Sequence, residues 1–141
     1  MALAHARSRE QSCTYPSASV APANRLLAVS RMICRIWHEW TSPERADAYE
    51  RLLREVIFVG IAERAIVGFR SIELLRRKAD GEEEFVTAMW FDSFEAVREF
   101  AGADLTRAVV PPAARALLSR FDARAAHYEV VMRGTDREFA E

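Results

Sequence analysis

The fold is decided by the stretch Met32-Ile-Cys-Arg-Ile-Trp-His-Glu-Trp40. It combines β-branched and aromatic residues with interleaved polar ones, which is typical of a β-strand. Because side chains along a strand alternate between its two faces, one face would carry Cys34, Ile36, His38 and Trp40. The opposite face would carry Ile33, Arg35, Trp37 and Glu39. Large apolar groups therefore lie on both faces of the predicted strand.

A helix and a hairpin are predicted to follow this strand. Ser42-Pro43-Glu44 supplies an N-cap residue, a proline at the first helical position and an acid in the first turn. Apolar residues then recur at helical spacing, and we expect the helix to end near Gly60. Residues 61–66 would form a connection. Residues 67–78 and 84–91 predict two strands around the turn Ala79-Asp80-Gly81.

The second half of the domain predicts two helices and a last strand. Asp92-Ser93-Phe94-Glu95 has the acid–x–x–Glu spacing of a capping box, and Gly102 would end the helix that follows. Pro111-Pro112 would open a third, shorter helix, which contains Leu117, Leu118 and Phe121. Residues 127–132 predict the fourth strand.

This order of elements predicts an α+β domain with a ferredoxin-like βαββαβ topology. Right-handed crossovers would place the first and third strands at the centre of an antiparallel sheet, with the helices on one face. The third strand, like the first, has apolar groups on both faces: Phe85, Thr87, Met89 and Phe91 on one, Val86, Ala88 and Trp90 on the other. A single helical layer covers only one face, and monomers rarely expose so large an apolar surface. We therefore expect a homodimer that packs open sheet against open sheet.

Composition excludes several classes of function. The chain has 141 residues, enough for one domain, and its formal net charge of −1 gives no field that would attract nucleic acid or an anionic membrane surface. Its two cysteines are too few for a disulfide framework, so a reducing cytoplasm is expected. No apolar run approaches the roughly 20 residues that span a bilayer.

The two ends of the chain differ from the domain at residues 32–133. Residues 1–31 are rich in Ala and Ser and carry four arginines against one acid, which predicts a flexible N-terminal leader. A transit peptide is one alternative for this segment. Another is that translation starts at Met32, directly before the first strand. Residues 134–141 are expected to form a C-terminal tail.

Four segments of the domain resemble the antibiotic-biosynthesis-monooxygenase-like group of the dimeric α/β-barrel superfamily. They are Met32-Ile-Cys-Arg-Ile-Trp-His38, Pro43-Glu-Arg-Ala-Asp-Ala-Tyr49, Trp90-Phe-Asp-Ser-Phe-Glu-Ala-Val-Arg-Glu-Phe-Ala-Gly102 and His127-Tyr-Glu-Val-Val131. The resemblance implies a ferredoxin-like protomer whose sheet closes a barrel with that of a second copy. It also implies a pocket for a small hydrophobic or aromatic ligand between the sheet and the helices.

The resemblance also implies an activity. Characterised members oxidise aromatic polyketides or quinols with oxygen and no cofactor, and a related branch degrades haem. That branch uses an Asn on the first strand, a Trp late in the second helix and an axial His. Here Phe100 and Val110 occupy the last two positions, and the first strand has no Asn, which argues against haem degradation.

Two histidines are the main candidates for chemistry. The first and fourth strands would be antiparallel neighbours, so His38 and His127 could share one edge of the sheet, near Trp40 and Phe85. His38 would be the catalytic base that removes a proton from a phenol or enol. Trp37, Trp40, Phe85 and His127 would contact the ligand. The alternatives are that the histidines only cap strand ends and the tryptophans only pack.

Other assignments of these residues stay open. A metal site from His38, His127 and Glu129 is conceivable, but no metal is expected. Arg35 could pair with an acid across the sheet, and binding an anion is the alternative. The leading hypothesis is a cofactor-independent monooxygenase-like protein acting on a small aromatic or quinoid molecule. The alternative is a non-enzymatic ligand-binding or assembly module on the same fold.

Overall fold

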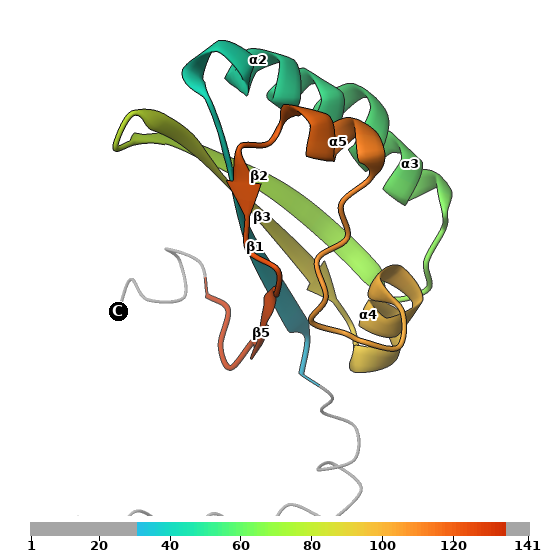
Figure 1. Ribbon diagram of the computed structural model, residues 1–141. Coiled ribbons are helices and arrows are strands. Elements are labelled where there is room, and N and C mark those ends of the chain that lie inside the picture. Colours follow the sequence, from blue (N-terminus) through green and yellow to red (C-terminus); the bar gives the residue numbers. More distant parts are fainter. Residues whose placement is uncertain (1–30, 135–141) are drawn as a thin grey trace, which may run out of the picture.

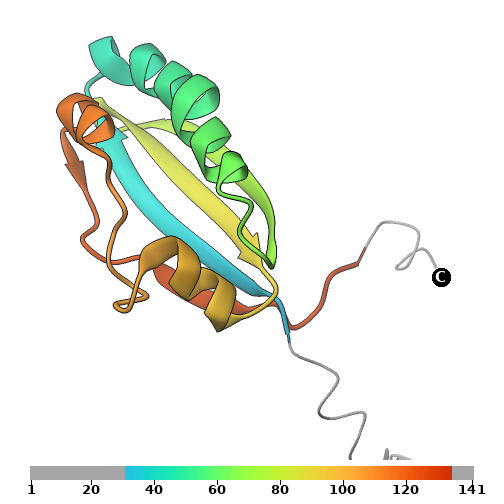
Figure 2. The same cartoon turned by 90° about the vertical axis from the view of Figure 1, so that its right-hand side faces the viewer.

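The computed structural model describes residues 31–134, which form an antiparallel sheet with helices packed on one of its faces (Figures 1 and 2). The strands are β1 (Ile33–Thr41), β2 (Phe69–Ala79), β3 (Glu82–Phe91), β4 (Arg120–Phe121) and β5 (Ala126–Glu129). The helical segments are α2 (Pro43–Leu52), η1 (Leu53–Ile57), α3 (Phe58–Glu63), α4 (Phe94–Ala101) and α5 (Pro112–Leu117).

The strand order confirms the predicted topology. The sheet runs β2-β3-β1, and β4 and β5 pair with different parts of the free edge of β1. β1 and β3 are therefore central, as the sequence predicts, and the domain has the expected ferredoxin-like βαββαβ fold. The last strand is shorter than predicted, since β5 ends at Glu129. The short strand β4 is an addition to the predicted order.

The register between β1 and β3 determines which side chains share a face. Glu39 lies opposite Phe85, and Arg35 lies opposite Met89. All four are buried, so this face is the one beneath the helices. The predicted alternation along both strands is confirmed. The other set of side chains, which includes Trp90, lies on a face that no helix of the described chain covers (Figure 2).

The core beneath the helices consists of two clusters. One lies between α2, α5 and the sheet, with Ala46, Tyr49, Leu53, Phe85, Ala114 and Leu118 as its buried members. The other lies between α4 and the opposite end of the sheet, with Ile33, Met89, Phe91, Ala96 and Val97 as its buried members. The helices therefore close over the sheet at two ends, and the middle is left less completely filled.

The first helix is longer than the sequence predicts. α2, η1 and α3 follow one another without a break to Glu63, so the expectation that the helix ends near Gly60 is wrong. Glycine lowers helix stability, but it ends a helix only where the backbone turns left-handed behind it. That turn occurs later, at Ala65, whose φ is 49°. Residues 61–63 are therefore helical, and only residues 64–66 of the predicted connection lead out of the helix toward β2.

Two further details differ from the predictions. The cap of α4 is Ser93, whose hydroxyl accepts a hydrogen bond from the amide of Ala96, whereas Asp92 forms an ion pair with Arg70. A residue can serve as N-cap only directly before the first helical turn, and α4 begins at Phe94. Leu118 and Phe121 lie outside the third helix, because α5 ends at Leu117: Leu118 is its C-cap and Phe121 lies in β4.

A close approach holds the start of β2 against α4. A side chain at Gly68 would place its Cβ 2.9 Å from the Cβ of Ala96, and the φ of Gly68 is 91°. Only glycine combines that backbone with that contact at low cost. The close packing of Gly68 on Ala96 therefore holds this end of the sheet against α4.

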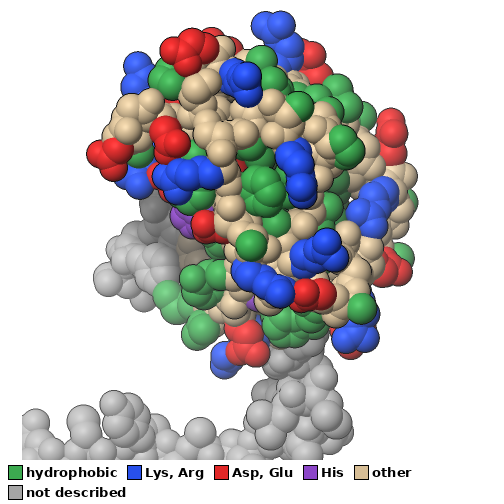
Figure 3. All heavy atoms as spheres, viewed as in Figure 1, with side chains coloured by type: hydrophobic (Ala, Val, Ile, Leu, Met, Phe, Trp, Pro, Cys, Tyr) green, Lys and Arg blue, Asp and Glu red, His purple; other side chains and the backbone are tan. Residues whose placement is uncertain are grey.

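The predicted leader and most of the predicted tail, residues 1–30 and 135–141, lie outside the described residues. Within residues 31–134, no helix combines the length and the apolar character that crossing a membrane requires. Basic and acidic side chains are interspersed on the face shown in Figure 3, which agrees with the near-zero net charge.

Candidate functional site

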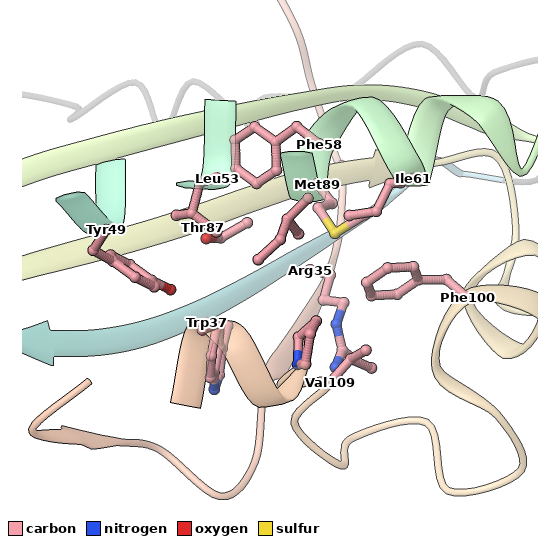
Figure 4. Close-up of a pocket in the computed structure, with 13 residues that line it drawn as sticks. Arg35, Trp37, Tyr49, Leu53, Phe58, Ile61, Thr87, Met89, Phe100 and Val109 are labelled. Carbon is pink, nitrogen blue, oxygen red and sulfur yellow. The ribbon is translucent and has the colours of Figure 1, made fainter. Parts of the chain in front are cut away.

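A pocket lies between the sheet and the helices, where the two core clusters meet (Figure 4). The cavity measures about 40 Å³, well below the roughly 300–1,000 Å³ of small-molecule sites, so a ligand would have to extend through its open side or displace the surrounding side chains. Its floor consists of Arg35, Trp37, Thr87 and Met89 from the two central strands. The first helix contributes Tyr49, Leu53, Ile57, Phe58 and Ile61. The remaining wall consists of Phe100, Val109, Pro111 and Ala114.

The irregular turn of the first helix faces this pocket. η1 is a π-helical turn, and Leu53 and Ile57 at its two ends both line the cavity. A π-turn inserts one residue into the helical register and thereby shifts the side chains that follow. Here Phe58 follows Ile57 directly, and both reach the same cavity. The turn thus widens the apolar wall that a ligand would contact.

Arg35 lies at one end of the pocket and is 3% exposed. Its guanidinium donates hydrogen bonds to the carbonyl oxygens of Leu105 and Arg107, and it lies 5.6 Å from the centre of the Phe100 ring. Burial lowers the pKa of Arg35 to about 10, so the group stays charged at neutral pH. The polar atoms that hold it are neutral.

His127 completes the surroundings of this guanidinium. Its Nε2 lies 3.0 Å from Nη1 of Arg35. Since a guanidinium can only donate, Nε2 accepts, and the histidine is neutral with its proton on Nδ1. The pKa of His127 is lowered, first by burial and then by the positive charge of Arg35. His127 therefore positions Arg35.

A buried carboxyl lies toward the other end of the pocket. Glu39 is fully buried, and its Oε1 accepts hydrogen bonds from the hydroxyls of Tyr49 and Thr87, each 2.9 Å away. Burial raises the pKa of Glu39 to about 8, although both hydrogen bonds act in the opposite direction. Its Oε2 has no partner in the described structure, which suits a protonated carboxyl. The same burial, and then the charge of Glu39, raises the pKa of Tyr49.

His38 lies on the open face of the sheet. Its Nδ1 forms a hydrogen bond of 3.0 Å with a carboxylate oxygen of Glu84, and its ring stacks on Trp40 at 6.2 Å. The guanidinium of Arg120 covers the Trp40 ring at 3.8 Å. The hydrogen bond from His38, and then that from Arg77, lowers the pKa of Glu84. This cluster is an ion-pair network at the edge of the uncovered surface.

The predicted site residues therefore divide between the two faces. Trp37 lines the pocket. His127 does not line it but contacts Arg35, which does. Phe85 lies on the same face, where it packs edge-on against Tyr49 at 5.0 Å between ring centres, but it does not line the cavity. His38 and Trp40 lie on the open face, away from this pocket.

The two histidines are not brought together. β5 pairs with β1 so that His127 lies opposite Arg35. Paired residues share a face, so the side chain of His127 points toward the helices, as that of Arg35 does. The side chain of His38 points to the open face. The prediction that they share one edge near Phe85 and Trp40 is wrong for this reason. The conceivable metal set of His38, His127 and Glu129 is divided in the same way.

Several pocket residues were not singled out from the sequence. Tyr49, Thr87, Met89 and Phe100 line the pocket and are not among the predicted site residues. One signal was available for the two charged groups. Arg35 and Glu39 have the same parity on β1 as Ile33 and Trp37, so the sequence places two ionisable residues among large apolar groups on one face, which either helices or a second copy would cover. A charge on a covered face is unusual and often functional.

Comparisons with known proteins agree with the fold. Neither a protein-family model nor a curated protein matches the chain. A solved structure from Bacillus cereus, provisionally described as an antibiotic biosynthesis monooxygenase, is 20% identical with a TM-score of 0.51, and the match covers 74% of this chain and 98% of that one. The structure of Rv0793 from Mycobacterium tuberculosis is 25% identical over the same shares, with a TM-score of 0.44. The first likeness confirms the ferredoxin-like fold that the sequence predicts.

Proposed function

We propose that this chain is a cytoplasmic, homodimeric, monooxygenase-like protein that acts on a small aromatic or quinoid molecule. The observation that carries the proposal is the pocket on the covered face. Its walls are mainly aliphatic and aromatic, and Trp37 and Phe100 offer ring surfaces to a planar ligand. The polar groups at its two ends, Arg35 and Tyr49, would fix the orientation of such a ligand.

The reaction would need no electrons from outside the substrate. In the oxidation of an anthrone-type methylene, a base removes a proton, the carbanion passes electrons to oxygen, and a carbon–oxygen bond forms. Loss of water then leaves a ketone, so that one oxygen atom enters the product and the other leaves as water. The protein would hold the substrate, exclude water and stabilise the anion. His38 stays the predicted base, and its place on the open face means that this role requires a substrate that reaches that surface.

A non-enzymatic ligand-binding module is the second candidate. It is favoured by the side chains that line the pocket, because among them only Arg35 and Tyr49 are ionisable. Arg35 stays protonated, and the raised pKa of Tyr49 keeps its hydroxyl neutral. Neither is a ready base at neutral pH. A binding role needs none.

The open face supports the homodimer. Leu75 and Tyr128 lie on it and are 52% and 59% exposed, and Trp90 lies opposite Cys34 on the same surface. A second copy that packs its own open face on this one would remove these groups from water. The pocket lies on the other side of the sheet, so both pockets of a dimer would stay accessible.

Oxygen uptake tests the enzymatic proposal. Wild-type protein would be assayed aerobically with a panel of anthrones and hydroquinones. Val109, which lines the pocket and is 37% exposed, offers a way to fill the pocket without disturbing the core. Val109→Trp should abolish turnover, and Val67→Trp, at a more exposed valine that does not line the pocket, should leave it unchanged. His38→Ala decides whether His38 is the base.

The outcomes separate the two candidates. Turnover that is lost only in Val109→Trp supports a monooxygenase that works in this pocket. Saturable binding of the same compounds without oxygen uptake, again lost in Val109→Trp, favours the binding module. If no compound binds or reacts, neither candidate holds for this class of ligand.

A further inference from the structure

Arg35 is a buried charge that has no acidic partner among the described residues. It is the buried arginine of residues 31–134, and none of the acids described in that range forms an ion pair with it. Arg70 pairs with Asp92, and Arg124 pairs with Asp104. Glu129, two residues beyond His127 on the same side of β5, pairs instead with Arg31.

A buried charge without a counter-ion is unfavourable. Desolvation opposes the charged form of Arg35, as the lowered pKa of the group shows, and neutral carbonyls compensate only part of that loss. Three contacts nevertheless hold the guanidinium in place: Leu105, Arg107 and His127. None of these three residues lines the pocket, whereas Arg35 does. The guanidinium is thus anchored from behind, at the end of a cavity that holds no negative charge.

We propose that the pocket selects aromatic ligands that carry an anionic oxygen, and that this oxygen pairs with Arg35. The inference rests on the proposed function, since it assumes that the pocket binds a small aromatic molecule. It adds a substrate class: an aromatic carboxylate, or a phenol or enol acidic enough to bind as its anion. A guanidinium has five N–H donors in a fixed plane, which match the lone pairs of such an oxygen well.

The rest of the pocket suits a ligand with one anionic end. Phe100 and Trp37 would flank its ring, and Phe100 already lies beside the guanidinium. The carboxyl near the cavity, that of Glu39, is neutral below its raised pKa of about 8 and so adds no repulsion. Arg35 and Glu39 are four residues apart on β1, roughly 13 Å along an extended strand. The pocket would therefore bind one anionic end of the ligand at Arg35. The other end of the ligand would meet only the neutral hydroxyls of Tyr49 and Thr87.

A pair of matched ligands tests the proposal. The affinity of 1-naphthoate would be compared with that of 1-naphthamide, which has a similar shape and no charge, by calorimetry at pH 7. Wild-type protein should bind the acid about tenfold to a hundredfold more tightly, since a hydrogen bond to a charged group contributes that range. Arg35→Met should bring the ratio close to one, because it removes the charge that only the acid pairs with, and the acid should lose far more affinity than the amide.

Two further variants separate charge from packing. Arg35→Lys keeps the charge but loses the planar donors, and it should retain part of the preference. Arg64→Met is the matched control, because Arg64 also lies over the Phe100 ring, at 5.7 Å, but outside the pocket. It should keep the wild-type ratio. Since the wild-type ratio needs no variant, the proposal stays testable even if Arg35→Met does not fold.

The outcomes distinguish this inference from the function on which it rests. Equal wild-type affinities for acid and amide, with both lost in Val109→Trp, overturn the inference and leave the pocket as a binding site. A preference for the acid that persists in Arg35→Met also overturns it. If neither compound binds, the inference and the proposed function fall together.

Discussion

The two faces of the sheet are both unusual, but in opposite ways. Beneath the helices the chain buries charged and polar groups, with Arg35 3% and Glu39 0% exposed. On the uncovered face it leaves apolar groups in water, such as Leu75 and Tyr128. A domain that works alone would be expected to bury its apolar groups and to expose its charges. This contrast is the reason why we propose a charged ligand for the covered face and a second copy for the open face.

The largest expected effect concerns the open face. Val86 lies between Leu75 and His38 across the sheet, at the centre of the surface that would pair. Val86→Arg would bury an unpaired charge in the dimer, at a cost of about 3–5 kcal/mol. The dimer should then dissociate at least about a hundredfold more readily. Sedimentation analysis over a range of protein concentrations measures this change.

The protomer itself should tolerate that substitution, because Val86 points away from the helix-side core. Its far-ultraviolet circular dichroism should stay that of the wild type. Val67→Arg, at an 84% exposed valine outside the sheet, should leave the dimer intact. A wild-type protein that is monomeric at micromolar concentration, with Trp90 in water, would contradict the dimer on which this comparison depends.

The next effect contrasts a glutamate on each face. Glu39→Gln mimics a protonated carboxyl, because the amide oxygen can still accept from Tyr49 and Thr87. Since the pKa of Glu39 is raised from 4.5 to about 8, the folded state binds the extra proton between these values. Wild-type stability should therefore fall as the pH rises from 5 to 9, by on the order of 3 kcal/mol relative to Glu39→Gln. Chemical denaturation at several pH values measures the difference.

Glu84 on the open face should show the opposite sign. Its pKa is lowered, first by the hydrogen bond from His38, so its contribution is present above pH 4.5 and is lost as the pH falls through the lowered pKa. Glu84→Gln should destabilise the protein at pH 7 and have little effect in acid. Parallel pH profiles for the two glutamine variants would contradict the contrast between the faces.

The sequence predicted which side chains share a face of the sheet but not which groups they contact there. Alternation gave the correct face for residues 33–40 and 85–91 of the two central strands, because a strand fixes side-chain direction with a period of two. It could not show that Arg35 would meet carbonyls of residues 105 and 107, since the segment between Gly102 and Pro111 has no periodicity. β4, which the sequence did not predict, pairs with Glu39 and Trp40, so β5 pairs farther along β1 and His127 lies opposite Arg35. Without β4 in the prediction, the two histidines were placed on one edge.

The smallest expected effect tests those histidines as a matched pair. His127→Ala removes one of the three acceptors around Arg35 and leaves the two carbonyls, so the affinity for 1-naphthoate should fall by about twofold to tenfold, the range of a single hydrogen bond. Binding of 1-naphthamide should not change. His38→Ala should leave both affinities at wild-type values, because the whole sheet separates His38 from the pocket.

The reverse result would be equally informative. If His38→Ala weakened binding and His127→Ala did not, the ligand would lie on the open face, beside Trp40 and Glu84, and the site predicted from the sequence would be the correct one. The pocket beneath the helices would then be a gap between two core clusters. Because both substitutions remove one imidazole from a strand of the same sheet, the difference between them reports on the face and not on the loss of a histidine.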